Sequence, residues 1–181
     1  IEHVALAASE SPAPSIVRGS SETPRDGAYD VVVTDPPYYD AYPYSDLSDV
    51  FFVWFKRTDS ARSLMRDPFD LRNPLTPKDA EAVQDEARTV GGKPKNAKFF
   101  EKVIGEAFGE GRRVLNESGL GCVVFAHKTT EGWEALISGM IQGGLTVAAS
   151  WPIATEQAHR LRAHDSAALA TSVHLICRPR P

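Results

Sequence analysis

Residues 30–39 read Asp-Val-Val-Val-Thr-Asp-Pro-Pro-Tyr-Tyr, an apolar run that stops at two consecutive prolines. The three valines are β-branched and turn-forming residues flank them, which predicts a short buried strand over residues 30–34. Pro36 and Pro37 fix two consecutive φ angles and remove two backbone donors, so strand pairing cannot continue past them. We therefore expect a rigid turn at the carboxyl end of a strand, the edge at which open α/β sheets bind their ligands.

This turn carries groups suited to one small planar amine. Asp35 offers a carboxylate, Pro36 a carbonyl and Tyr38 an aromatic face, while Pro37 keeps the three from relaxing. Two acceptors can bind both hydrogens of an exocyclic amine and favour a more nucleophilic nitrogen. A base extruded from nucleic acid presents such an amine, and stacking on Tyr38 would be worth about 1–3 kcal/mol. The plainer alternative is a capped turn without chemistry.

The tetrapeptide Asp35–Tyr38 resembles motif IV of the amino-methyltransferases, which methylate exocyclic amines of adenine or cytosine with S-adenosylmethionine. Its aspartate, where other enzymes have serine, points to N6-adenine among the DNA enzymes. The longer runs over residues 34–49 and 51–57 are similar to a group of large prokaryotic adenine-specific DNA methylases, some of them encoded near anti-phage defence genes. The resemblance covers most of residues 14–180.

The resemblance implies catalytic roles for Asp35, Pro36, Pro37 and Tyr38. It also implies S-adenosylmethionine as cofactor, DNA as substrate, other defence-system proteins as candidate partners and the prokaryotic cytoplasm as location. Two other functions stay open. One is an RNA adenine or guanine N2 methyltransferase, although those enzymes more often carry Asn before the two prolines. The other is a non-catalytic nucleic-acid-binding module that retains the fold.

Further side chains near the expected sheet edge are candidates for substrate contacts. The loop after the motif contains Tyr39, Asp40, Tyr42 and Tyr44. These residues could line the base pocket or pack on the following helix. His127 and Lys128 end a predicted strand over residues 121–126, on the same edge. They could contact substrate or phosphate, or they could cap a helix.

The cofactor side of such a site is incomplete in this sequence. Enzymes of this type hold the methionine end of the cofactor on a glycine-rich turn after the first strand, and no such turn occurs here. Gly19-Ser20-Ser21 lies where the family usually has Gly-Asp-Ala, and Ser20 can hydrogen-bond but carries no charge. We expect residues 1–181 to form one catalytic segment with a loop-rich insertion over 58–96, and the glycine-rich half to precede Ile1 in a longer protein.

Hydrophobic periodicity predicts an α/β organisation. The expected strands cover residues 15–18, 30–34, 121–126, 145–151 and 171–178. The expected helices are 46–57, entered through Ser45 or Asp46; a short one from Pro77 through Ala87; 98–116, ended by Ser118-Gly119; and 133–141, stopped by Gly143-Gly144. Gly91-Gly92 is interpreted as a hinge, and Trp54 and Trp133 as core residues. By resemblance, the sheet is a partial Rossmann-like methyltransferase sheet whose antiparallel last strand inserts between the two strands before it.

Composition limits the class of protein. Hydrophobic residues make up 42% and charged residues 24% of the chain, which is ordinary for a soluble globular protein. No apolar run approaches a membrane span, and the first residues lack the basic region of a signal peptide. Cys122 and Cys177 indicate neither a zinc site nor a disulfide framework, and we expect them to be reduced neighbours in the sheet. The net charge of −4 differs from the basic footprint of DNA binders, so a basic surface would be local or lie elsewhere in the protein.

Overall fold

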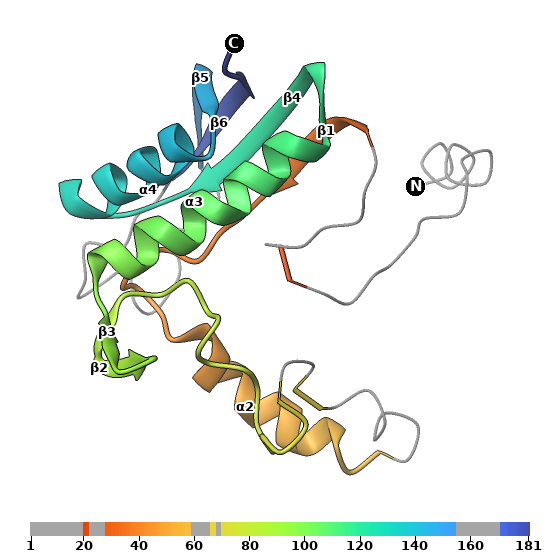
Figure 1. Ribbon diagram of the computed structural model, residues 1–181, viewed down its shortest axis with the longest axis vertical. Coiled ribbons are helices and arrows are strands. Elements are labelled where there is room, and N and C mark those ends of the chain that lie inside the picture. Colours follow the sequence, from red (N-terminus) through yellow and green to blue (C-terminus); the bar gives the residue numbers. More distant parts are fainter. Residues whose placement is uncertain (1–19, 22–27, 59–65, 68–69, 155–170) are drawn as a thin grey trace.

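The computed structural model describes residues 20–21, 28–58, 66–67, 70–154 and 171–181. Within them the chain is mixed α/β (Figure 1). The elements in chain order are β1 (Tyr29–Thr34), α2 (Tyr44–Phe55), β2 (Asp85–Val90), β3 (Lys93–Lys95), α3 (Ala97–Val114), β4 (Leu115–Phe125), α4 (Thr130–Gln142), β5 (Leu145–Ile153) and β6 (Ser172–Pro179). The strand expected over residues 15–18 and the connection expected over 155–169 lie outside the described residues.

The main sheet has four strands in the order β1-β4-β6-β5. β1 runs parallel to β4, and β6 lies antiparallel between β4 and β5. This arrangement confirms the expected strand order, including the insertion of the last strand between its two predecessors. It also confirms that the cysteines are close, because Gly121 pairs with Cys177 and Cys122 pairs with Ile176 on adjacent strands, and both thiols are free.

The core lies between the sheet and two helices. Figure 1 shows α3 and α4 side by side across one face of the sheet. The helices cross closely through Gly139, where an added Cβ would lie 2.8 Å from Cγ2 of Ile104 on α3. The buried apolar side chains of this core include Phe100, Phe108, Phe125, Leu136 and Met140. Trp133 packs against this cluster, as expected.

The opposite face of the sheet is not covered by any described element. Val31 and Val33 point to that face and are 57% and 66% exposed, whereas Val32 faces α3. The apolar surface continues across the sheet through Leu120, Trp151 and Ile153. The expectation that β1 is buried is therefore wrong: four of its six residues are exposed and the other two are half-buried, because α3 and α4 cover one face alone.

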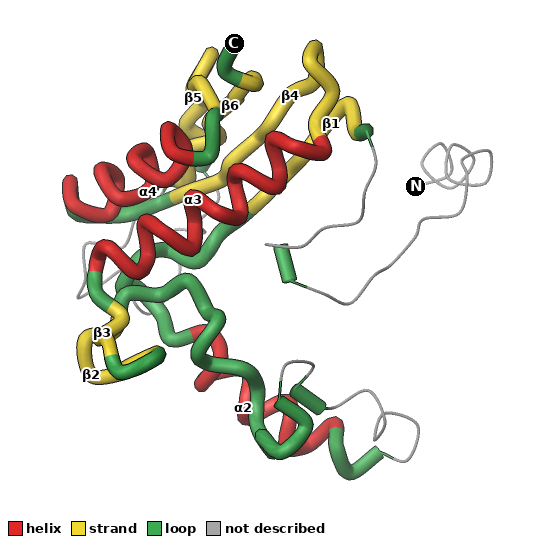
Figure 2. Tube along the Cα trace, viewed as in Figure 1, coloured by secondary structure: helices red, strands yellow, loops and turns green. Residues whose placement is uncertain are grey.

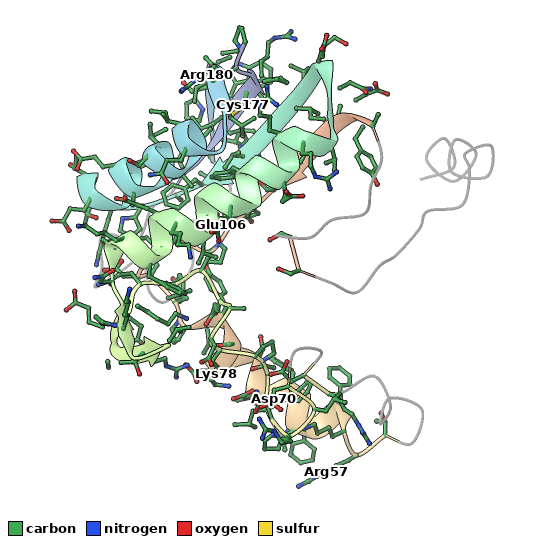
Figure 3. The ribbon with its side chains drawn as sticks, in the orientation of Figure 1. Arg57, Asp70, Lys78, Glu106, Cys177 and Arg180 are labelled. Atoms are coloured by element: carbon green, nitrogen blue, oxygen red, sulfur yellow. The ribbon has the colours of Figure 1, made fainter. Side chains whose placement is uncertain are left out.

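A segment away from the sheet carries α2 (Figure 2). We call α2 together with residues 70–84 the arm. Hydrogen bonds and ion pairs hold α2 to the rest of the insertion: Ser45 to Glu81 at 2.6 Å, Asp49 to Lys78 at 2.6 Å and Asp46 to Arg88 at 2.7 Å. Figure 3 places Lys78 near the base of the arm and Arg57 near its tip. α2 follows Pro43 without a side-chain cap, so the expected capping by Ser45 or Asp46 is wrong: these two side chains make the tertiary contacts instead.

The apolar stripe of α2 faces outward. Its exposed residues are Leu47, Val50, Phe51, Trp54 and Phe55. Trp54 is 65% exposed and Arg57 lies over its ring at 4.9 Å, so the assignment of Trp54 to the core is wrong. Hydrophobic periodicity predicted this helix correctly. However, the described residues cover the polar side of α2 and leave its apolar side exposed.

Three further boundaries differ from expectation. Gly91 and Gly92, with φ of 57° and 78°, form the tight turn of the β2–β3 hairpin and are not a hinge. No helix follows Pro77. Instead, the Glu81 carboxylate accepts a hydrogen bond from the Ser45 amide, and the chain then enters β2. α3 does not end at Ser118-Gly119: Leu115 is already extended, and the helix passes directly into β4.

The hairpin is fastened to the arm by a buried lysine. Lys95 is 1% exposed, and its Nζ donates to the carbonyl of Lys78 at 2.7 Å and lies 5.1 Å from the Phe99 ring centre. Burial lowers the pKa of this ammonium group, which nearby acidic groups partly oppose. Immediately afterwards Asn96 caps α3 by accepting a hydrogen bond from the Phe99 amide.

None of the described helices has the length and apolar character needed to cross a membrane.

Cys177 provides a test of the sheet. Burial raises the pKa of its thiol from 9.0 to about 11, and Cys122 adds to the shift. We expect iodoacetamide at pH 8 to alkylate Cys177 about a hundredfold more slowly in the folded than in the urea-unfolded chain. The contribution of this thiol to stability is full below pH 9 and declines as pH rises toward 11.

Mass spectrometry of the labelled peptides measures both rates, and the Cys122→Ser variant assigns the signal of Cys177. Equal labelling of Cys177 in the folded and unfolded chain would contradict its central place in the sheet.

Candidate functional site

A pocket of about 270 Å³ lies at the carboxyl end of β1. It is lined by Asp35, Pro36, Pro37, Tyr38 and Tyr44. The four residues of the predicted motif thus meet in one hollow, and the strand ends at Thr34 as the prolines require. The pocket contains one carboxylate and two phenol rings.

Of the four loop residues named as candidates for the base pocket, Tyr44 is the one that lines it. It is the first residue of α2, so the start of the arm forms one wall. Burial raises the pKa of its phenol, the nearby Asp35 carboxylate raises it further, and a hydrogen bond with the Tyr38 backbone opposes the shift. The phenol therefore stays protonated at neutral pH beside Asp35.

Tyr38 belongs to both the pocket and the core. Its ring meets Phe125, the last residue of β4, edge to face at 5.3 Å. Because β4 pairs with β1, the sheet fixes the position of the Tyr38 ring relative to the end of β1. Tyr38 is half-buried, which leaves part of it to the pocket.

The loop after the motif is held by backbone hydrogen bonds. The Tyr39 amide donates to the Pro37 carbonyl at 3.0 Å, and the Ala41 amide donates to the Tyr38 carbonyl at 2.9 Å. The Tyr39 carbonyl accepts from Gln84 of the arm at 3.0 Å. Tyr39 has φ of 56°, a left-handed conformation that is uncommon for a bulky residue and marks a constrained backbone.

The aromatic residues of this loop differ in burial and in the residues that they contact. Tyr39 is 7% exposed, and its ring packs edge to face on Phe100 at 5.1 Å and on His127 at 5.6 Å. Tyr39 thus packs on α3 and on His127, and it does not line the pocket. Tyr42 is exposed and tilts against Tyr44 at 5.8 Å, outside the lining of the pocket.

His127 and Lys128 follow β4 on the expected edge of the sheet. His127 is buried, and its Nε2 lies 3.0 Å from Oδ1 of Asp40. Its Nδ1 accepts from the amide of Thr129, the residue that caps α4. Thr129 is thus the cap of α4, and His127 contacts this cap residue without capping the helix itself. Lys128 is exposed beside it, and neither residue lines the pocket.

The remaining candidate, Ser20, is half-buried and is not part of the pocket lining. Among the residues that the structure describes, no cluster of three or more His, Cys, Asp or Glu side chains could hold a metal ion. No protein-family model matches the chain, and no curated protein matches it significantly.

The two motif side chains should differ in their effect on stability. We expect Tyr38→Ala to lower the free energy of unfolding by about 1–3 kcal/mol, because the ring packs on Phe125. Asp35→Ala should change it by less than about 0.5 kcal/mol, because the carboxylate is exposed.

Urea titrations followed by tryptophan fluorescence measure both values. Tyr42→Ala is the matched control, since it removes an exposed ring from the same loop. A loss for Tyr38→Ala no greater than that for Tyr42→Ala would show that Tyr38 does not pack as described.

Proposed function

We propose that this chain is the catalytic segment of a DNA methyltransferase that acts on N6 of adenine and depends on S-adenosylmethionine. The observation that carries the proposal is the pocket at the end of β1, where the Asp35, Pro36, Pro37 and Tyr38 side chains and backbone converge. The resemblance of this motif to that of the amino-methyltransferases supplies the reaction class. The mixed α/β sheet, with its antiparallel β6 between β4 and β5, is compatible with it.

The size of the pocket suits one base. Sites for drug-sized ligands measure about 300–1,000 Å³, and this pocket, at about 270 Å³, lies just below that range. A flat aromatic group could enter between Tyr38 and Tyr44 with its amine toward Asp35. A base still stacked in a duplex could not, so the target nucleotide would be extruded, at a cost of a few kcal/mol.

In this proposal the chain makes the N6 amine of adenine more nucleophilic. The Asp35 carboxylate and the Pro36 carbonyl accept the two N6 hydrogens, and the hydrogen bond to the charged carboxylate contributes about 1.5–3 kcal/mol. Holding both hydrogens favours a more tetrahedral nitrogen with a more available lone pair. The protonated Tyr44 phenol beside Asp35 adds no second negative charge to the pocket. The Tyr38 ring stacks on the base and fixes its plane.

The cofactor half of the site stays a prediction from the sequence. Ser20 is the sole candidate from sequence, and it does not line the pocket. No step of methyl transfer is therefore assigned to a cofactor-binding residue of this chain.

A second candidate function rests on the pocket alone. The same pocket could bind an extruded base without methylating it, in a nucleic-acid-binding module that retains the fold. The two functions differ in whether Asp35 is needed for chemistry or for binding alone. An RNA adenine or guanine N2 methyltransferase differs from the first proposal in its substrate and product.

The proposal is tested in a protein that joins this chain to a cofactor-binding half. Asp35→Ala should abolish methyl incorporation into unmethylated DNA. The activity of Asp35→Asn should lie between those of Asp35→Ala and the parent protein, since asparagine keeps an acceptor and loses the charge. Tyr38→Phe and Tyr38→Trp should retain much of the activity, because every aromatic ring offers a face to the base, whereas Tyr38→Ala should lose most of it.

Mass spectrometry of the digested DNA identifies the modified base. Tyr42→Phe is the control for a conservative change beside the pocket. Transfer by Asp35→Ala at the parental rate, or a product other than N6-methyladenine, would disprove the assignment of this pocket to adenine.

A further inference from the structure

We infer that His127 is a positioning residue that holds the motif loop through Asp40. This inference rests on the proposed function for its consequence in catalysis, but its structural part stands without it. Asp40 follows Tyr38 by two residues, and His127 lies in the turn between β4 and α4. The 3.0 Å contact between His127 Nε2 and Asp40 Oδ1 therefore joins the loop after β1 to the end of the neighbouring strand.

The hydrogen bonds of His127 define its protonation pattern. The Thr129 amide can only donate, and it lies 3.2 Å from Nδ1 of the ring, so Nδ1 carries no proton. The Thr129 hydroxyl, 3.0 Å from the same nitrogen, accepts from the Gly132 amide and can donate its own hydrogen to Nδ1. Nε2 then carries the ring proton and donates it to Asp40. A doubly protonated ring would place an N–H against the Thr129 amide and lose that bond.

The ring cannot turn away from this arrangement. An added Cβ on Gly132 would lie 2.2 Å from Nδ1, so the first turn of α4 is in direct contact with the ring. Phe125 stacks on the ring at 6.1 Å, and Tyr39 meets it edge to face at 5.6 Å. The Trp133 indole donates to the His127 carbonyl at 3.0 Å and fixes the backbone as well. His127 is thus a rigid donor whose side chain is 2% exposed, whereas the Asp40 side chain is 49% exposed.

Tyr39, which lies between Tyr38 and Asp40, is the residue that the Asp40–His127 contact constrains. Tyr39 is held at φ of 56°, a conformation that costs a bulky residue about 1–3 kcal/mol. If Asp40 were released, Tyr39 could return to negative φ, and the adjoining peptide groups would rotate with it. The Tyr38 ring would then lose its fixed direction relative to the pocket. The Asp40–His127 bond therefore offsets the strain that presents Tyr38 to a base.

Substitutions at position 127 can separate the bond from the packing. His127→Phe keeps a flat ring against Phe125 and Tyr39 but removes the donor. His127→Gln gives up the ring and keeps an N–H that can reach Asp40. A purely structural ring would be replaced better by Phe, whereas a positioning donor would be replaced better by Gln.

The direct measurement is amide hydrogen exchange of the 181-residue chain, read at Tyr39 and Ala41. Both amides are hydrogen-bonded within the loop. We expect His127→Phe and Asp40→Ala each to speed their exchange about tenfold, the factor that corresponds to one lost hydrogen bond. Combining the two changes should add little, and His127→Gln should restore most of the protection. Lys128→Ala, a change at the exposed neighbour, is the control and should have no effect.

Nitrogen-15 spectra of the imidazole at pH 7 test the tautomer independently, and they should show a proton on Nε2 and none on Nδ1. Unchanged exchange in Asp40→Ala, better protection by Phe than by Gln, or a proton on Nδ1 would overturn the inference. If His127→Phe does not fold, Asp40→Ala and Asp40→Asn decide the question, and Asn should retain protection because it keeps an acceptor.

The consequence for catalysis is read in the protein that includes a cofactor-binding half. His127→Phe should lower kcat for methyl transfer about tenfold with little change in KM for DNA, and His127→Gln should recover part of the loss. If exchange responds as expected and no variant or parent protein methylates DNA, the proposed function fails while the positioning role of His127 stands.

Discussion

The block that Pro36-Pro37 place on strand pairing just after β1 is the constraint on which the rest of the site depends. β1 pairs in parallel with β4 through Thr34, and two prolines then make further pairing impossible. The chain has to leave the sheet at the edge where β4 also ends, so the motif and His127 lie side by side although they are far apart in sequence. The pocket forms in the angle between the departing loop and the start of α2.

Features decided by short-range chemistry could be predicted from the sequence. The valines and prolines marked the strand and its end, and Gly143-Gly144 stopped α4, where Gly144 adopts φ of 75°. The order of the four strands followed from the family resemblance and is confirmed. The end of the strand and the end of α4 depend on local residues alone, whereas the strand order depended on the resemblance.

Features decided by tertiary contacts could not be predicted. The outward direction of the apolar stripe of α2 follows from polar bonds such as that between Asp49 and Lys78, which periodicity does not reveal. Gly119 looked like a helix end, yet β4 had already begun at Leu115. In the site, Asp35 and Tyr38 were placed correctly by the motif. The sequence left two roles open for Tyr39, because its burial depends on a left-handed backbone that the sequence does not reveal.

The central claim is that Asp35 accepts hydrogen bonds from the amine of an extruded adenine. It is tested most directly by nuclear magnetic resonance on a DNA oligonucleotide whose adenine carries nitrogen-15 at N6, mixed with the 181-residue chain. The account predicts that the N6 proton resonances of one adenine move downfield on binding and that Asp35→Ala abolishes the shift while DNA is still bound through other contacts. N6 resonances that do not move, or that move equally with Asp35→Ala, would contradict it.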